Sequence, residues 1–229
     1  MQAAVIVFPG SNCDRDVAVA LERASGQRPL MVWHKDSVLP DVDLIVLPGG
    51  FSYGDYLRSG AIAAHSPVLR DVKARAEKGT AVLGICNGFQ VLIESGLLPG
   101  GLLRNESLKY ICKDVGLTVQ SNESVFTRHY HSDQRVVFPI AHGDGNYFID
   151  ESGRKRLEDE ERIAFRYCDT KGQVTPEANP NGSVANIAGI YNKQRNVLGM
   201  MPHPERLADP ALGGNDGAAM FDGLVEALS

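Results

Sequence analysis

The segment Gly84-Ile85-Cys86-Asn87-Gly88 has the glycine-flanked form of a nucleophile elbow, with a thiol in place of a hydroxyl. Such an elbow holds its nucleophile in a strained backbone conformation between a strand and a helix, so glycine is needed on both sides. The start of the helix would stabilise a thiolate and point backbone N–H groups at a developing oxyanion. The pattern favours Cys86 as a nucleophile, with a packed cysteine in a glycine-rich strand end as the alternative.

A nucleophilic cysteine also needs a base, and among six histidines His203 has the most informative neighbours. It lies in Met201-Pro202-His203-Pro204-Glu205, where each proline biases the residue before it toward extended geometry. In extended chain His203 and Glu205 face the same side, about 6.5 to 7 Å apart at Cα. The carboxylate can then hold the imidazole tautomer, which predicts a Cys86, His203 and Glu205 triad. A surface histidine in a proline turn is the alternative.

Acyl chemistry requires a second oxyanion donor, and Pro48-Gly49-Gly50-Phe51 is a candidate at the end of another apolar run. Glycine at position 50 allows close approach of the backbone to a reacting oxygen. Gly-Gly pairs are also common in ordinary turns, so this segment alone indicates little.

The elements that must position these residues alternate between apolar strand runs and helical patterns over the first hundred residues. This alternation predicts a parallel sheet covered on both faces, a doubly wound α/β architecture. The second half instead predicts strands or hairpins with few helices, one charged helical turn at 154–161 and a closing helix at 220–228. We expect one domain over residues 1–229. The expected strands are 3–8, 30–33, 44–47, 80–85, 110–119, 136–141, 147–149, 163–167, 185–191 and 197–201.

Composition narrows the function classes further. Of 229 residues 43% are hydrophobic and 22% are charged, which is ordinary for a globular chain, and the net charge of −5 argues against nucleic acid or an anionic membrane as main partner. No apolar run approaches the ~20 residues of a membrane span, and the first residues lack a signal-peptide pattern. The four cysteines form no C-x-x-C pair, so neither zinc nor disulfides are indicated. We expect a cytoplasmic protein.

Together, the Pro-Gly-Gly loop, the elbow with Gln90 four residues after its cysteine, and the His-Pro-Glu segment resemble the class I, or triad, glutamine amidotransferases, which have a flavodoxin-like fold. The resemblance implies that Cys86 attacks the side-chain amide of L-glutamine and that His203, oriented by Glu205, acts as base and then acid. It also implies the remaining site residues: backbone N–H groups of Gly50 and Asn87 at the oxyanion, and Gln90 at the substrate.

Longer motifs are similar to a narrower family, the glutaminase subunits of phosphoribosylformylglycinamidine synthases of purine biosynthesis. That resemblance implies no cofactor on this chain, ATP and magnesium on a separate synthetase subunit that receives ammonia, and a small accessory subunit. One departure is Asp144, where the family's His-Gly-x-Gly stretch is expected to carry glutamate, so a glutamine contact from His142 to Asp144 stays open. The motifs are Phe8-Pro9-Gly10-Ser11-Asn12-Cys13-Asp14, Gly49-Gly50-Phe51-Ser52-Tyr53-Gly54-Asp55, Pro139-Ile140-Ala141-His142-Gly143 and Gly199-Met200-Met201-Pro202-His203-Pro204-Glu205-Arg206.

Two other functions remain alternatives at this point. A stand-alone hydrolase of γ-glutamyl bonds, or a related cysteine peptidase, would turn over without any partner. A catalytically silent regulatory subunit would carry Cys86 as a packed thiol, but such a chain has no physical reason to retain all three triad groups. If the family resemblance holds, we expect low glutaminase activity in the isolated chain.

Overall fold

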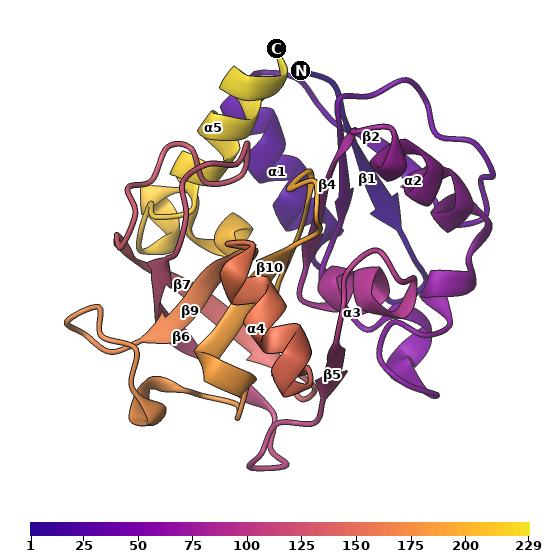
Figure 1. Cartoon of the computed structure of the whole chain (residues 1–229). Helices are drawn as coiled ribbons and strands as arrows, with labels where there is room; N and C mark the ends of the chain where they lie inside the picture. Colours follow the sequence, from indigo (N-terminus) through magenta and orange to yellow (C-terminus); the bar gives the residue numbers. More distant parts are fainter.

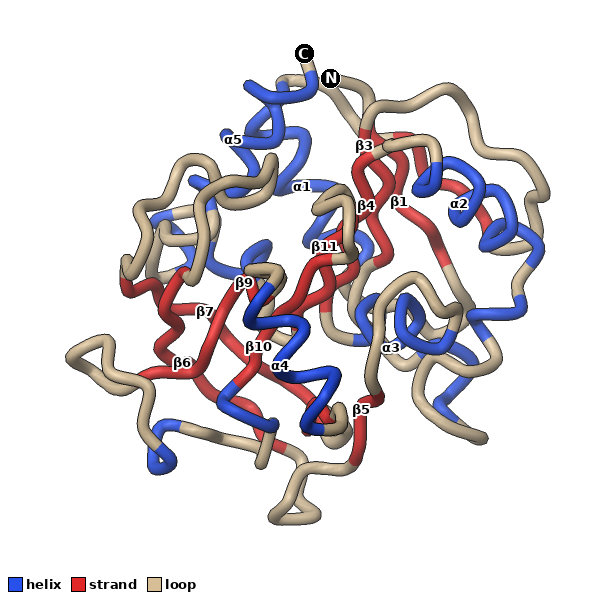
Figure 2. Tube along the Cα trace, viewed as in Figure 1, coloured by secondary structure: helices blue, strands red, loops and turns tan.

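The computed structural model describes all 229 residues and contains one sheet of nine strands and a second sheet of two. Figure 2 shows the large sheet running through the middle of the molecule, with helices on either side. The strands are β1 (Ala3–Val7), β2 (Leu30–Trp33), β3 (Leu44–Leu47), β4 (Ala81–Ile85), β5 (Gly101–Leu103), β6 (Ile111–Val119), β7 (Arg135–His142), β8 (Asn146–Phe148), β9 (Ile163–Cys168), β10 (Ile187–Tyr191) and β11 (Val197–Met200).

The large sheet has a parallel half and an antiparallel half. Strands β2, β1, β3, β4 and β11 are adjacent in that order and parallel, which is the strand order of flavodoxin-like folds. Strands β10, β9, β6 and β7 extend the sheet in antiparallel pairs. The predicted fold class is confirmed, and the change of pattern in the second half of the sequence corresponds to the antiparallel strands.

Five α-helices and six 3₁₀ turns connect the strands. Helix α1 packs on β1 and on α5, whereas α3 packs on β3, β4 and β11, and Figure 1 shows these groups on different sides of the parallel strands. The helices are α1 (Asp14–Ser25), α2 (Pro67–Glu77), α3 (Asn87–Glu94), α4 (Glu151–Asp159) and α5 (Ala218–Leu228). The 3₁₀ turns are η1 (Ser52–Asp55), η2 (Ala63–His65), η3 (Pro176–Ala178), η4 (Val184–Asn186), η5 (Pro204–Leu207) and η6 (Pro210–Leu212).

Local sequence accounts for the helix boundaries. Helix α1 buries Val17, Ala20 and Leu21 on one face and ends at Gly26, whose φ of 70° is the left-handed conformation that glycine adopts without strain. Helix α2 begins at Pro67. Proline suits this position because an N–H group in the first turn would have no partner within the helix, so its absence costs no hydrogen bond.

The core lies on both faces of the central strands, where β3, β4 and β11 are buried along their whole length. Such strands read as continuous apolar runs, because helices cover both faces of a parallel sheet. Their carboxyl ends share one edge: Leu47 of β3 lies beside Gly84 of β4, and Met200 of β11 lies beside Ile85. The loop at 48–51, the elbow and the His-Pro-Glu segment therefore start from neighbouring positions.

Two details differ from the sequence expectation. Strand β5 was not expected, and it pairs with β8 outside the large sheet. Helix α4 begins at Glu151 and not at 154, because the Asp150 carboxylate accepts a hydrogen bond from the Gly153 N–H and caps the first turn. No helix combines the length and the apolar character needed to cross a membrane.

Candidate active site

Cys86 occupies the junction between β4 and α3, as the elbow pattern predicts. Its φ of 51° and ψ of −106° are rarely adopted by a residue with a side chain, and such strain concentrates at functional positions. Its N–H donates to the Met200 carbonyl at 2.8 Å, which ties the elbow to β11. The Sγ atom is buried and lies 3.7 Å from the Ala141 carbonyl oxygen.

The two glycines of the elbow leave no space for a side chain. A Cβ atom at Gly88 would lie 1.9 Å from the carbonyl oxygen of Leu47, which belongs to the backbone of β3. A Cβ atom at Gly84 would lie 2.4 Å from a methyl carbon of Leu92 and 2.8 Å from the Gly88 carbonyl. Glycine is therefore required because α3 packs directly against the strands at its start.

His203 and Glu205 form a buried hydrogen-bonded pair. The distance from His203 Nδ1 to Glu205 Oε1 is 2.6 Å, and neither residue is more than 2% exposed. The expected extended geometry is wrong, because Pro204 begins the 3₁₀ turn η5 and Glu205 lies within it. The turn still brings the carboxylate to the imidazole, while the His203 N–H, bonded to the Pro139 carbonyl at 2.8 Å, fixes the start of the turn.

The charge state of His203 follows from its neighbours. Burial alone lowers the pKa of the imidazole, but the negative charges of Glu205 and of the Cys86 sulfur outweigh burial. The pKa of His203 therefore lies well above its usual value of 6.5. Its Nε2 atom is buried without a hydrogen-bond partner, so this nitrogen is free to exchange a proton with a reacting group.

Gly50 and Asn87, at the start of α3, are the two residues expected to supply backbone N–H groups to an oxyanion. Gly50 has a φ of 149°, and a Cβ atom there would lie 2.8 Å from the Gly10 carbonyl, so the loop conformation requires glycine. Asn87 is the first residue of α3, and the first N–H groups of a helix have no partner within it. Gly50 lines the same cavity as Cys86, and Asn87 directly follows Cys86, so both residues are candidates for oxyanion donors.

The side chains of Asn87 and Gln90 take part in an internal hydrogen-bond network. The Asn87 amide accepts from the Ser52 N–H at 3.1 Å and donates to Gln90 Oε1 at 2.8 Å. The Gln90 amide donates to the Asp144 carbonyl at 2.7 Å. The network joins the loop after β3 to the segment that follows β7, and both side chains are buried.

A small cavity brings Cys86, His203 and Gly50 together. Glu205 does not line the cavity but is hydrogen-bonded to His203, which does. Asn87 and Gln90 are not among the lining residues. The cavity has a volume of about 30 Å³. Its lining residues are Asn12, Cys13, Gly50, Phe51, Cys86, Tyr110, Ala141, His203 and Arg206.

His142 and Asp144 lie beside the site without lining the cavity. His142 is buried, and its Nδ1 atom lies 3.0 Å from Asn105 Oδ1. Burial, followed by the positive charge of His203, lowers the pKa of His142 to about 4, so this imidazole is neutral. The Asp144 carboxylate accepts a hydrogen bond from the Ser59 hydroxyl at 3.0 Å and lies 3.8 Å from Arg104.

No role in the site was expected for Cys13, although it lies in one of the matching motifs. Cys13 stands at the N-cap position of α1, but its side chain makes no cap bond. Its Sγ atom accepts a hydrogen bond from Arg206 at 2.9 Å and lines the same cavity as Cys86. The strand order contained a signal, because residues that follow β1 reach the same sheet edge as those that follow β3 and β4.

One group of side chains has the spacing of metal ligands. The sulfur of Cys13, a nitrogen of His203 and an oxygen of Glu205 lie within 4.8 Å of one another. However, the imidazole and the carboxylate are already hydrogen-bonded to each other, and the Arg206 guanidinium occupies the sulfur. A positive charge at that position disfavours a cation, so the group fits the triad better than a metal site.

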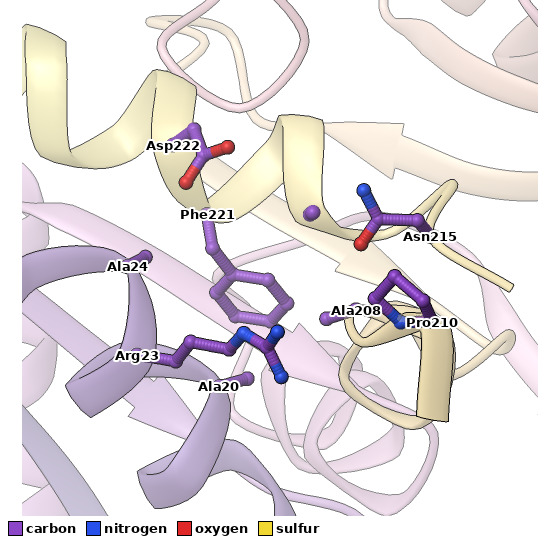
Figure 3. A pocket seen from close by; sticks show the side chains of 9 residues that line it. Ala20, Arg23, Ala24, Ala208, Pro210, Asn215, Phe221 and Asp222 are labelled. Atoms are coloured by element: carbon purple, nitrogen blue, oxygen red, sulfur yellow. The ribbon is translucent and has the colours of Figure 1, made fainter. Parts of the chain in front are cut away.

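A larger cavity lies between α1 and α5 and shares no residue with the site. It has a volume of about 280 Å³, and Figure 3 shows Arg23 extending beside the ring of Phe221 toward Pro210. Arg23 forms an ion pair with Asp209, so its charge is already neutralised. The cavity offers none of the chemistry found around Cys86.

The fold and the site define a class, which comparison with known families supports. Residues 1–213 match the family described as the CobB/CobQ-like glutamine amidotransferase domain. The chain therefore belongs to the glutamine amidotransferases.

Individual relatives narrow that class. The chain is 56% identical to the phosphoribosylformylglycinamidine synthase subunit PurQ of Zymomonas mobilis, over 100% of both chains, and 59% identical to that of Roseobacter denitrificans, over 100% of this chain and 99% of the relative. A solved structure, PurLQS from Thermotoga maritima, matches with a TM-score of 0.87 and 44% identity over 100% of this chain and 99% of that one. The chain belongs to the PurQ family of phosphoribosylformylglycinamidine synthase subunits.

Proposed function

We propose that residues 1–229 act as one glutaminase domain that releases ammonia from the side-chain amide of L-glutamine through a thioester on Cys86. His203 transfers the protons, Glu205 orients it, and the N–H groups of Gly50 and Asn87 stabilise the oxyanion. The observation that carries the proposal is the buried His203–Glu205 pair, whose free Nε2 shares a cavity with a cysteine on a strained elbow.

The first half of the reaction forms a C–S bond and breaks the amide C–N bond. The Cys86 thiolate attacks the amide carbon, and the carbonyl oxygen becomes an oxyanion. His203 then donates its Nε2 proton to the amide nitrogen, and ammonia leaves. The raised pKa of His203 suits this step, because the proton must be on the imidazole before the attack.

The second half returns the enzyme to its first state. Water attacks the thioester carbon, the neutral imidazole of His203 takes a proton from that water, and the C–S bond breaks to release glutamate. Gln90 takes part in substrate binding by exchanging its bond to the Asp144 carbonyl for one to glutamine. The contact network around His142 and Asp144 holds the segment against which the substrate lies.

Ammonia is then used by a synthetase subunit that converts formylglycinamide ribonucleotide to formylglycinamidine ribonucleotide. ATP and magnesium bind that subunit, because this chain has no phosphate-binding G-x-x-x-x-G-K-[ST] segment, and a small accessory subunit completes the complex. Ammonia protonated in bulk water loses its nucleophilicity, so it must pass through a closed conduit. The two subunits must therefore work in contact, and we place this chain with its partner in the cytoplasm.

The decisive experiment compares two sources of nitrogen in the reconstituted complex. Cys86→Ala should abolish glutamine-dependent synthesis and leave ammonia-dependent synthesis unchanged, whereas Cys112→Ala, which removes an exposed thiol, should leave both unchanged. Equal loss of both activities in Cys86→Ala would indicate a structural role. Glutamine hydrolysis by the isolated wild-type chain at the rate of the complex would favour a stand-alone γ-glutamyl hydrolase.

A further inference from the structure

Gly50, one of the two proposed oxyanion donors, begins a loop whose conformation decides where its N–H group points. This segment, residues 50–55, follows β3 and includes the 3₁₀ turn η1, and we call it the oxyanion loop. The Phe51 N–H donates to the Gly10 carbonyl at 2.9 Å, and Gly50 forms a β-bridge with Ser11. The start of the loop therefore rests on the turn that follows β1.

The 3₁₀ turn within the loop is bonded to the elbow. The Ser52 N–H donates to Asn87 Oδ1 at 3.1 Å, and the Ser52 hydroxyl donates to the same oxygen. The Asn87 amide also donates to Asp55 Oδ1 at 3.4 Å. Because Asn87 directly follows Cys86, this second anchor belongs to the site already described.

The loop needs a further anchor because its backbone is strained. Tyr53 has a φ of 57° and a ψ of 23°, and Asp55 has a φ of 53°, which are unfavourable values for residues with side chains. Gly54 between them has a φ of 72°. Such a conformation persists only where the surroundings hold it. Relaxation at Tyr53 would displace the backbone close to Gly50.

The anchor for Tyr53 is a histidine outside the site. The Tyr53 hydroxyl oxygen lies 2.6 Å from His34 Nδ1 and 3.2 Å from the Ser66 hydroxyl oxygen. The Tyr53 N–H also donates to the Pro9 carbonyl at 2.7 Å. His34 directly follows β2, and Ser66 directly precedes α2. The Tyr53 side chain thus joins the oxyanion loop to two elements that do not line the cavity.

His34 is fixed in place, and its ring has no other hydrogen bond. The residue is 3% exposed, its N–H donates to the Val7 carbonyl at 3.0 Å, and its ring meets the Trp33 ring edge-on with centroids 4.4 Å apart. Its Nε2 atom is buried without a partner. Burial is the main cause that lowers the pKa of His34, so the ring is neutral. Packing alone does not account for a buried imidazole, because an apolar side chain would fill the space without the cost of desolvation.

We propose that His34 and Tyr53 are positioning residues of the glutaminase reaction: the bond between their side chains holds the oxyanion loop so that the Gly50 N–H faces the oxyanion. This inference rests on the proposed function. Neither His34 nor Tyr53 lines the cavity, so both act through the backbone of the loop. The oxyanion exists only after the attack, so a displaced Gly50 N–H weakens the transition state more than it weakens glutamine binding.

Variants in the complex reconstituted with the synthetase and accessory subunits test the bond. Tyr53→Phe removes the hydroxyl and His34→Leu removes its partner. Each should lower kcat for glutamate release by about tenfold or more, with the KM for glutamine within about twofold and ammonia-dependent synthesis unchanged. An unchanged kcat in both variants, or a raised KM at normal kcat, overturns the proposal.

A conservative variant tests whether the hydrogen bond itself matters. His34→Asn should restore most of the lost kcat, because the asparagine amide places an oxygen and an NH₂ group as far along the side chain as Nδ1 lies in histidine. Either group can bond the Tyr53 hydroxyl. A loss of kcat in His34→Asn as large as in His34→Leu overturns the proposal.

Two measurements separate positioning from a general loss of structure. Tyr191→Phe removes another tyrosine hydroxyl with two hydroxyl partners, Ser124 at 2.9 Å and Thr127 at 3.0 Å, and should leave kcat unchanged because β10 does not line the cavity. Iodoacetamide alkylates a thiol without forming an oxyanion. Its rate at Cys86, followed in the complex by peptide mapping, should be equal in Tyr53→Phe and the wild type. A parallel fall in alkylation and kcat would show a disrupted site and overturn the proposal.

The wild-type complex keeps this test apart from the test of the proposed function. If it makes product from ammonia but not from glutamine, the proposed function itself fails. If it uses glutamine and Tyr53→Phe does so equally well, only the positioning role of His34 and Tyr53 fails.

Discussion

Two buried histidines close to each other are driven to opposite charge states. His203 has a carboxylate at 2.6 Å and its pKa is raised, whereas His142 faces the Asn105 amide and its pKa is lowered to about 4. The two protonation states are compatible, because a neutral His142 does not repel the positive charge of His203. The site thus holds one proton donor and one uncharged support.

The two histidines predict opposite pH effects on stability. Below pH 6.5 the unfolded chain protonates His142 while the folded chain does not, so stability falls as the pH drops toward 4, by up to about 3 kcal/mol. His203 stabilises the fold fully below pH 6.5 and loses that contribution as the pH rises through its raised pKa.

Urea unfolding of paired variants measures both effects. Between pH 7 and pH 4.5, the wild type should lose more free energy of unfolding than His142→Gln, and between pH 7 and alkaline pH it should lose more than His203→Gln. Carboxylates that are present in both the wild type and the variant change the free energy of unfolding alike, so their effect cancels in the difference. Parallel pH curves for a variant and the wild type would show that the corresponding shift is absent.

Thiol reactivity should depend on the reagent. Cys112 is exposed, whereas Cys13, Cys86 and Cys168 are buried, so a small neutral alkylating agent should modify Cys112 first. A glutamine-analogue electrophile added to the complete complex should modify Cys86 and spare the others, which peptide mapping can show. Equal modification of all four cysteines by the analogue would argue against an activated nucleophile.

At the scale of elements, the elbow depends on how closely α3 approaches β3. Gly88→Ala should destabilise the chain by at least about 3 kcal/mol, because the new Cβ atom would meet a strand carbonyl that has no freedom to move. Gly101→Ala is the matched control: no atom lies within 4 Å of its Cβ position, so the change should stay within about 0.5 kcal/mol. Urea denaturation compares the two, and equal stability would contradict the packing argument.

The sequence predicted the parallel half of the sheet well, since strands such as 30–33 and 44–47 are short apolar runs between turn signals, and both have the expected bounds. It also predicted the contact between His203 and Glu205, although it expected an extended backbone where the structure has a 3₁₀ turn. Pro204 favours the first position of a 3₁₀ turn as well as following an extended residue, and the sequence does not distinguish the two effects.

The rest of the site could not be predicted because it is tertiary. Cys13 and Tyr110 meet Cys86 only after the strands are placed side by side, and neither belongs to the motif of the nucleophile or that of the base. Arg206 does end the motif of the base, but nothing in that motif indicates its contact with Cys13. Strand β5 is three residues long with few periodic signals, so only its pairing with β8 defines it. Long-range pairing of this kind leaves no local pattern to detect.

At the scale of the whole molecule, the candidate site lies at one edge of the sheet. Residues that follow the carboxyl ends of β1, β3, β4 and β11 line the cavity, together with Tyr110 before β6 and Ala141 of β7. Helix α3 lies beside the loop that follows β3, and the Arg58–Glu94 ion pair joins the two.

The cavity at Cys86, with a volume of about 30 Å³, also bears on the sequence of events in time. If free subunits exclude the amino acid, association must precede its entry, and turnover must begin with a delay that shortens as the synthetase concentration rises. Stopped-flow mixing of separate subunits with glutamine should show this lag, and preassembled complex should start at full speed. An immediate linear onset from separate subunits would mean that the two ligands arrive in either order.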